Sequence, residues 1–139
     1  MTIAQGQPRA TPNDRCFACG DRNSRGLRLC FAPDGDRAVT AVWRTDAVWE
    51  GFRGVIHGGI VSTVLDEAMS KAVAAAGIPA LTCELHVRLR RHVAAAEQLQ
   101  VSGWVVEKRK RRIVTEATLK DRNGVERAHA WATFLALQP

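Results

Sequence analysis

Hydrophobic and polar positions alternate along this chain with two different periods, and these periods predict its elements. Residues 58–76 combine a broad apolar surface with a narrower polar stripe at three- and four-residue spacing, which predicts one long helix. Gly77 and Pro79 follow it, as is typical beyond the end of a helix. Six other stretches alternate with a period of two and are expected to be strands. They cover residues 27–31, 37–43, 81–90, 99–107, 112–120 and 126–137.

The order of these elements predicts the fold class. Two strands come first, then the long helix, then four further strands, and turn-forming residues separate the strands in 32–36 and 121–124. An antiparallel sheet with its single helix packed on one face satisfies this order, so we expect an α+β protein. We find no internal repeat, and we expect a single domain over residues 14–139 after a flexible tail over residues 1–13.

The strand that follows the helix has a clear alternation of apolar and polar positions. One face is predicted to carry Leu81, Cys83, Leu85, Val87 and Leu89. The opposite face is predicted to carry Thr82, Glu84, His86, Arg88 and Arg90.

The composition is that of an ordinary globular protein. The chain has 139 residues, of which 46% are hydrophobic and 24% are charged, so it is long enough to bury a core. No run approaches the roughly 18 apolar residues of a membrane-spanning helix, and the N-terminal sequence lacks the apolar stretch of a secretory signal. We therefore expect a cytoplasmic protein without a membrane partner, with its four cysteines reduced.

The net charge of +6 is unevenly distributed. Residues 1–80 carry nine Lys and Arg against eight Asp and Glu, whereas residues 81–139 carry eleven against six. The excess lies in segments 87–93 and 108–112. Such segments bind nucleic acid, a membrane surface or a phosphorylated small molecule, or form a solvated hairpin end. Nucleic acid is not the expected partner, because tyrosine is absent and only Trp104 lies in a strand bordering 108–112.

The pair Cys16-x-x-Cys19 suggests zinc or redox chemistry. A structural zinc site commonly uses two such pairs, and here Cys30 and His57 would have to be recruited from distant positions. A thioredoxin-like redox motif would lie between a strand and a helix, whereas this pair follows the N-terminal tail. We therefore expect no metal, and we expect both thiols to pack as small apolar groups in a turn.

The segment GVIHGGIVSTVLDEAM, residues 54–69, combines two features of acyl-transfer chemistry. Gly58 and Gly59 open the helix, and bare N–H groups at a helix start attract a negatively charged oxygen. Asp66 lies two turns further on, where an ionised carboxylate acts as a general base or a nucleophile. Glu67 is rotated by about 100° from Asp66 around the helix, so we assign it a structural role. Three roles stay open for His57: a general base, a helix cap or a packed side chain.

This segment resembles the hotdog-fold acyl-CoA thioesterases, in particular their phenylacetyl-CoA thioesterase-like branch. The preceding CFACGDRNSRGLRL, residues 16–29, is similar to an N-terminal signature of that branch, with Ser24 in place of the usual proline. The resemblance extends from about Cys16 to the C-terminus. It implies a highly curved antiparallel sheet around one helix and homodimers that join their sheets edge to edge, often pairing into homotetramers. It also implies active sites at the dimer interface.

The resemblance implies roles for individual residues as well. Gly58 supplies the N–H that polarises the thioester carbonyl, Asp66 is the base or nucleophile, and Thr82 helps to hold the attacking water. His57 belongs to the same catalytic motif. The resemblance further implies that acyl-CoA is contacted by Glu50, Gly51, Gly59, Arg88, Arg90, Arg91, Lys108 and Arg109. The basic members suit the phosphates of coenzyme A, which is part of the substrate, and no further cofactor is expected.

One departure from the resemblance leaves an alternative open. Gly51 stands six residues before His57, where many relatives carry Asn or Gln in contact with the thioester or the water. A non-catalytic hotdog protein that binds acyl-CoA is therefore the alternative to a thioesterase. A hotdog dehydratase is a third interpretation, and it would need a catalytic histidine on a differently spaced loop.

Overall fold

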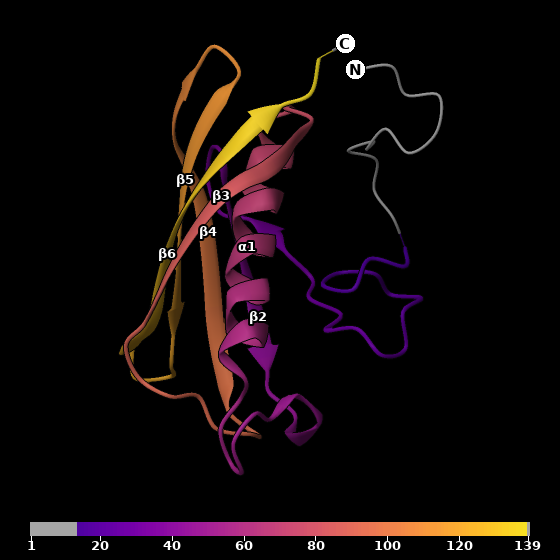
Figure 1. Ribbon diagram of the computed structural model, residues 1–139, viewed down its shortest axis with the longest axis vertical. Coiled ribbons are helices and arrows are strands. Elements are labelled where there is room, and N and C mark those ends of the chain that lie inside the picture. Colours follow the sequence, from indigo (N-terminus) through magenta and orange to yellow (C-terminus); the bar gives the residue numbers. More distant parts are fainter. Residues whose placement is uncertain (1–13, 139) are drawn as a thin grey trace.

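The computed structural model describes residues 14–138, and within that range six antiparallel strands curve around one long helix (Figure 1). In chain order the elements are β1 (Ala32–Pro33), β2 (Ala38–Arg44), the short 3-10 helix η1 (Ala47–Trp49), α1 (Gly58–Ala75), β3 (Ala80–Leu89), β4 (Gln98–Arg109), β5 (Arg112–Lys120) and β6 (Glu126–Ala136). The strands lie in the order β1-β2-β4-β5-β6-β3 across the sheet. The predicted α+β architecture is confirmed. Residues 1–13, for which the sequence predicts a flexible tail, lie outside the described residues.

The predicted helix and five of the six predicted strands are confirmed, with small shifts at their ends. The strand predicted over residues 27–31 is wrong. Leu27 and Leu29 are buried while their neighbours are exposed, so the alternation is real. Their N–H groups, however, bond to carbonyls of the preceding turns rather than to a neighbouring strand. Arg28 between them has a φ of 52°, which interrupts extended backbone. Strand β1 instead occupies two residues of the predicted turn 32–36.

Helix α1 is buried because five strands, β2 to β6, pack against it. Its buried side chains are Val61, Val64, Leu65, Ala68, Met69, Ala72 and Val73. The approach between helix and sheet is very close at Gly103 in β4, where an added Cβ atom would lie 2.5 Å from the carbonyl oxygen of Ala68. Any side chain at this position would push the helix backbone away from the sheet. The absence of a side chain at Gly103 therefore sets how closely α1 approaches β4.

Strand β3 contains a bulge that changes which way its first residues face. The register with β6 shifts between Thr82 and Glu84, so Cys83 is an extra residue. Thr82 pairs with the buried Phe134 and faces α1, whereas Leu81 pairs with the exposed Leu135. The predicted alternation is therefore wrong at the start of this strand. Beyond the bulge, Leu85 and Leu89 face the helix as predicted. Before the bulge, Thr82 faces the helix in place of Leu81.

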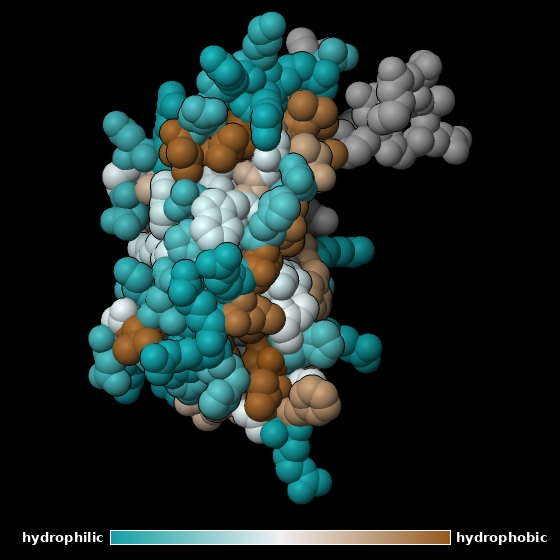
Figure 2. All heavy atoms as spheres, turned by 60° about the vertical axis from the view of Figure 1, so that its left-hand side comes forward, coloured by the Kyte–Doolittle hydropathy of each residue, from teal (hydrophilic) through white to brown (hydrophobic). Residues whose placement is uncertain are grey.

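The outer side of β3 is an open edge of the sheet. Among the described residues β3 pairs with β6 alone, so its other row of backbone groups has no neighbouring strand. Three leucines along it stay exposed: Leu81 by 40%, Leu85 by 38% and Leu89 by 53%. Figure 2 shows a mostly hydrophilic face on which hydrophobic side chains gather in a broken band down one side. An edge of this kind favours pairing with another strand.

The helical segments in residues 14–138 fall short of the length and apolar character that crossing a bilayer would require.

Replacing Gly103 with alanine is expected to lower the free energy of unfolding by about 1–3 kcal/mol, because the added methyl group meets the backbone of Ala68. Denaturant titration of the two proteins gives the difference. Lys120→Ala at an exposed position of β5 is the control, and it should stay within about 0.5 kcal/mol of the wild type. Equal stability of Gly103→Ala and wild type would contradict the close approach of α1 to β4.

Candidate active site

A tight turn leads the chain into the start of α1. The Glu50 carboxylate accepts a hydrogen bond from the Gly54 N–H at 2.9 Å, and Gly54 has a φ of 81°, which favours glycine. Glu50 and Ile56 pair across the turn as an isolated bridge. The His57 N–H then donates to the Trp49 carbonyl at 2.9 Å. Glu50, a predicted substrate contact, thus has a structural partner of its own.

The side chain of His57 caps the helix. Its Nδ1 accepts a hydrogen bond from the Gly59 N–H at 2.9 Å, so this nitrogen carries no proton. Of the three roles that the sequence leaves open for His57, this hydrogen bond corresponds to the helix cap. Within residues 14–138 no acceptor pairs with the N–H of Gly58, the first helical residue. Gly58 is therefore the glycine whose donor is free for a ligand, because the Gly59 N–H is already used.

An apolar depression lies beside these glycines. Its volume is ≈ 430 Å³, and it is lined by Val48, Trp49, Glu50, His57, Gly59 and Ile60. Val48 is 78% exposed, and Phe52 in the same loop is 87% exposed. Large apolar side chains left in solvent around an opening are typical of a binding surface. The depression falls within the range of small-molecule sites, about 300–1,000 Å³.

Asp66 lies on the flank of α1 that faces β3. The Thr82 hydroxyl donates a hydrogen bond to its Oδ1 at 2.7 Å, a contact that depends on the bulge turning Thr82 towards the helix. Burial raises the pKa of Asp66 above the usual value for aspartate, and the hydrogen bond from Thr82 acts in the opposite direction. A carboxylate with a raised pKa and a fixed orientation is better suited to accept a proton than an exposed one. The structure thus brings together two of the predicted catalytic residues.

The structure does not bring Gly58 and Asp66 together within one chain. Asp66 follows Gly58 by eight residues, which at 1.5 Å per residue places them about 12 Å apart along α1. A carbonyl bond is only about 1.2 Å long. The thioester carbonyl of one substrate therefore cannot meet the Gly58 N–H and the Asp66 carboxylate of the same chain.

The basic residues Arg88, Arg90 and Arg91 lie at the end of β3, next to the start of α1. A methyl carbon of Leu89 lies 2.9 Å from the position that a Cβ of Gly58 would take, which shows how close this strand end comes to the helix start. The Arg88 guanidinium lies over the Trp131 ring at 5.9 Å. Arg90 Nε pairs with Glu126 at 2.8 Å, and Arg91 is exposed.

Lys108 and Arg109 lie in the hairpin between β4 and β5, at the other end of the sheet. Followed strand by strand, the register places Lys108 level with Thr82, and Thr82 lies six residues from Arg88. At about 3.3 Å per residue the two basic groups are roughly 20 Å apart along the strands. They cannot contact the same phosphate group within one chain.

Glu67 lies on the opposite flank of α1 from Asp66. One of its carboxylate oxygens and the two sulfur atoms of Cys16 and Cys19 all lie within 4.8 Å of one another. Cys16 also packs against the hydrophobic core, in keeping with the packing role that the sequence predicts. Sequence reasoning missed the contact with Glu67, because it joins a turn near the N-terminus to the middle of the helix.

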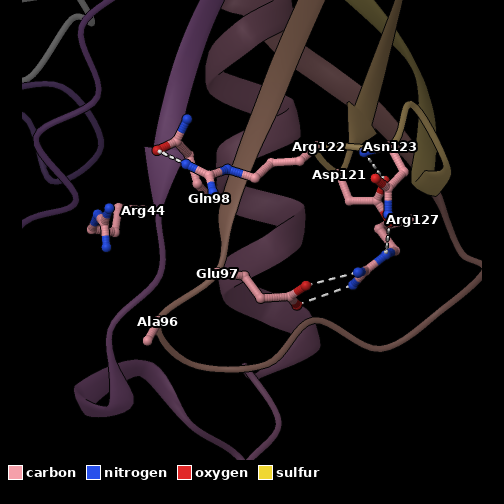
Figure 3. A pocket seen from close by; sticks show the side chains of 8 residues that line it. All are labelled: Arg44, Ala96, Glu97, Gln98, Asp121, Arg122, Asn123 and Arg127. Atoms are coloured by element: carbon pink, nitrogen blue, oxygen red, sulfur yellow. Dashed lines mark hydrogen bonds and ion pairs between the residues drawn. The ribbon is translucent and has the colours of Figure 1, made fainter.

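A second pocket, of ≈ 310 Å³, lies between the ends of β2, β4 and β6 (Figure 3). Arg127 pairs there with Glu97 at 2.7 Å and with Asp121 at 3.0 Å. The hydrogen bond from Arg127 holds the pKa of Glu97 below the usual glutamate value. Paired carboxylates of low pKa are poorly suited to accept a proton, so this network fastens loops together rather than doing chemistry. Glu97 lies 30 residues before Arg127, and no motif in the sequence signals this pair.

Comparisons with known proteins agree with this fold. The model of the thioesterase superfamily matches residues 53–128. No curated protein matches the chain. Among solved structures, a thioesterase superfamily protein superposes with a TM-score of 0.82 at 22% identity; the match covers 86% of this chain and 62% of that one, so this chain spans less than two thirds of that protein's length.

Two further structures show the same likeness. The PaaI protein of the phenylacetic acid degradation operon of Escherichia coli superposes with a TM-score of 0.76 at 15% identity, covering 81% of each chain. A hypothetical thioesterase from Streptococcus pneumoniae, solved with coenzyme A, superposes with a TM-score of 0.74 at 16% identity, covering 78% of this chain and 85% of that one. The predicted hotdog fold is confirmed. Since the superfamily model spans more than half of the residues, from the turn before α1 to the start of β6, this chain belongs to the thioesterase superfamily.

Proposed function

We propose that this protein is an acyl-CoA thioesterase, which hydrolyses a thioester to a free acid and coenzyme A. The observation that carries the proposal is the hydrogen bond from Thr82 to the half-buried Asp66, on the central helix of a thioesterase-superfamily fold. This contact supplies an oriented carboxylate whose pKa is raised by burial. The Gly58 N–H, for which residues 14–138 offer no acceptor, supplies the donor that acyl transfer needs.

Each residue has a separate task in this reaction. The Gly58 N–H donates to the thioester oxygen and stabilises the negative charge that develops there. Asp66 takes a proton from water as the water oxygen attacks the carbonyl carbon, or it attacks that carbon itself. The carbon–sulfur bond then breaks, and a proton passes to the leaving thiolate of coenzyme A. Direct attack leaves an acyl–Asp66 anhydride, which water then hydrolyses to the free acid. Thr82 binds one oxygen of Asp66, which leaves the other oxygen to react.

We infer that each active site uses two copies of the chain, since Gly58 and Asp66 lie about 12 Å apart along one helix. A two-fold axis near Ser62, midway between them, would place Gly58 of each copy beside Asp66 of the other. The open edge of β3, with its exposed leucines, supports such pairing. The assembly is then a homodimer, or a homotetramer made of two such dimers.

Coenzyme A is the proposed carrier of the acyl group. The pneumococcal thioesterase was solved with coenzyme A, and the smu.793 protein of Streptococcus mutans with acetyl-CoA. In this chain Arg88, Arg90 and Arg91 lie at the end of β3, where Leu89 comes close to Gly58, and the exposed Arg91 suits the phosphates of the carrier. The apolar depression suits the acyl group. Lys108 and Arg109 lie too far away to contact the phosphates in the same chain. They suit those phosphates only when they come from a second copy of the chain.

Binding of acyl-CoA without hydrolysis is the alternative function, and Gly51 favours it. This position has no side chain to hold a water, and its N–H donates to the Val55 carbonyl at 2.9 Å. The carboxylate of the neighbouring Glu50 is engaged by the Gly54 N–H. A measured turnover separates the two functions.

Asp66→Asn keeps the shape of the side chain and removes the base, so kcat is expected to fall by about 10²–10⁴ with little change in KM. Free thiol released from a panel of acyl-CoA and aryl-acyl-CoA esters measures the rate. Asp36→Asn, at an exposed position in the turn before β2, is the control and should keep the wild-type rate. Full activity of Asp66→Asn would show that another group is the base. A wild-type protein that binds the esters in calorimetry but hydrolyses none of them would establish the alternative function.

Thr82→Ala removes the hydrogen bond that lowers the pKa of Asp66, so this pKa is expected to rise further. Asp66 must be ionised to accept a proton, and the acid limb of the kcat/KM profile should therefore shift to higher pH. Thr82→Ser keeps the hydroxyl and should restore the wild-type profile. The profiles of the three proteins are measured over the same pH range. An acid limb that does not move in Thr82→Ala would contradict the coupling between Thr82 and the base.

A further inference from the structure

The chain before β1 folds into a tight turn that places two cysteines side by side. The Gly20 N–H donates to the Cys16 carbonyl at 2.8 Å, and the Arg22 N–H donates to the Asp14 carbonyl at 2.9 Å. A Cβ atom at Gly20 would collide with the backbone of Cys16 and Asp14, so only glycine fits directly after Cys19. The turn therefore requires the glycine that follows Cys19.

The segment over residues 14–31 packs against the polar flank of α1. Figure 1 shows this segment in indigo, on the other side of α1 from β5 and β6. Ala18, Leu27 and Leu29 are buried in the core. The Leu27 N–H donates to the Phe17 carbonyl at 2.8 Å, and the Leu29 N–H donates to the Ala18 carbonyl at 2.9 Å. These contacts hold both cysteines above Glu67, with no neighbouring strand to support the segment in residues 14–31.

Four polar groups meet at this point. The two sulfur atoms and a Glu67 oxygen lie within 4.8 Å of one another, and all three residues are half-buried. Lys71, one turn further along α1, places its Nζ 4.0 Å from Glu67 Oε1. Burial and the neighbouring Glu67 raise the pKa of the Cys19 thiol to about 12, so without a metal this thiol is protonated and bonds to the carboxylate. Reduced, half-buried thiols that converge on a carboxylate form a donor set for a metal ion.

We propose that Cys16, Cys19 and Glu67 bind one Zn²⁺, with a water molecule as the fourth ligand. Tetrahedral zinc with sulfur at about 2.3 Å and oxygen at about 2.0 Å separates its ligand atoms by roughly 3.5–3.8 Å. The observed spacing of up to 4.8 Å exceeds this value by about 1.3 Å at most, a difference that falls within the reach of side-chain rotation. Two thiolates select zinc over magnesium or calcium, which prefer oxygen ligands alone.

Binding is balanced in protons and in charge. Two thiols lose their protons to solvent as two Zn–S bonds form, and no electron is transferred. The three negative charges of the ligands are then offset by the two positive charges of the ion and by Lys71. The sequence contains one Cys-x-x-Cys pair rather than the two that a structural zinc site commonly uses. The third ligand is instead a carboxylate supplied by the helix.

The proposed ion lies outside the proposed active site. Glu67 projects about 100° away from Asp66 around α1, so the ion does not reach the carboxylate assigned as the base. It joins the segment over residues 14–31 to the helix residue next to Asp66. A metal link of this kind stabilises a segment that has few backbone partners.

Cobalt and zinc titrations of the reduced protein test this proposal. Co²⁺ should give a thiolate-to-cobalt charge-transfer band with a stoichiometry of one per chain, and Zn²⁺ should abolish the band and raise Tm. Cys16→Ser and Cys19→Ser should lose the band. Glu67→Gln keeps both thiols and should weaken Zn²⁺ binding by at least about 10–100-fold, the loss typical even of an outer-shell partner. Circular dichroism confirms that each variant is folded.

Cys30→Ser is the matched control, because Cys30 is an exposed free cysteine outside the cluster. It should bind both metals like the wild type. The proposal is overturned if the reduced wild type gives no thiolate–cobalt band with metal in excess, or if Cys19→Ser binds Zn²⁺ as tightly as Cys30→Ser. Unchanged affinity in Glu67→Gln would remove the carboxylate from the site and overturn it as well.

Discussion

The burial of a single helix by a single sheet is the constraint on which the rest of the structure depends. Five strands contact α1, and Gly103 allows its backbone to approach β4 closely. Side chains that face the sheet must be apolar, so polar side chains are confined to the two flanks of the helix. One flank meets the edge strand β3 and carries Asp66, whereas the other meets the N-terminal segment and carries Glu67. The adjacent residues Asp66 and Glu67 therefore contact different parts of the chain.

The bulge in β3 adds the second determinant of the site. Without the extra residue Cys83, Thr82 would face away from the helix, and Asp66 would lose its only hydrogen-bond partner among residues 14–138. The helix itself imposes the third determinant, because its rise separates the Gly58 donor from the Asp66 carboxylate. The same strand that positions Thr82 is an open edge with exposed leucines. In the proposed function one strand thus serves both the chemistry of the site and the pairing of two chains.

The sequence predicted those features that depend on local pattern. The period of α1, its start at Gly58 and the four strands after it follow from the spacing of apolar residues and from glycine and proline positions. The strand over 27–31 was wrong because a loop lying on the core has the same alternating burial as a strand. A bulge leaves no trace in the alternation itself, so the orientation predicted for Thr82 was wrong, and only its catalytic role came from the resemblance to a family. Contacts between distant segments, such as Glu67 with the cysteines and Arg127 with Glu97, had no signal in the sequence.

The central claim is that Gly58 of one copy works with Asp66 of another, and mixed dimers of two inactive variants test it most directly. Proline is tolerated at the first position of a helix, and His57 before it has a ψ of 131°, so Gly58→Pro deletes the N–H donor and keeps the start of α1, while the flexible end of the Leu89 side chain moves aside for the ring. Heterodimers purified from differently tagged Gly58→Pro and Asp66→Asn chains should regain about half of the wild-type kcat, because one of the two sites is intact. A heterodimer of wild type with a chain carrying both changes should be inactive. The reverse result, with the first heterodimer inactive and the second half active, would place the whole site within one chain and contradict the account.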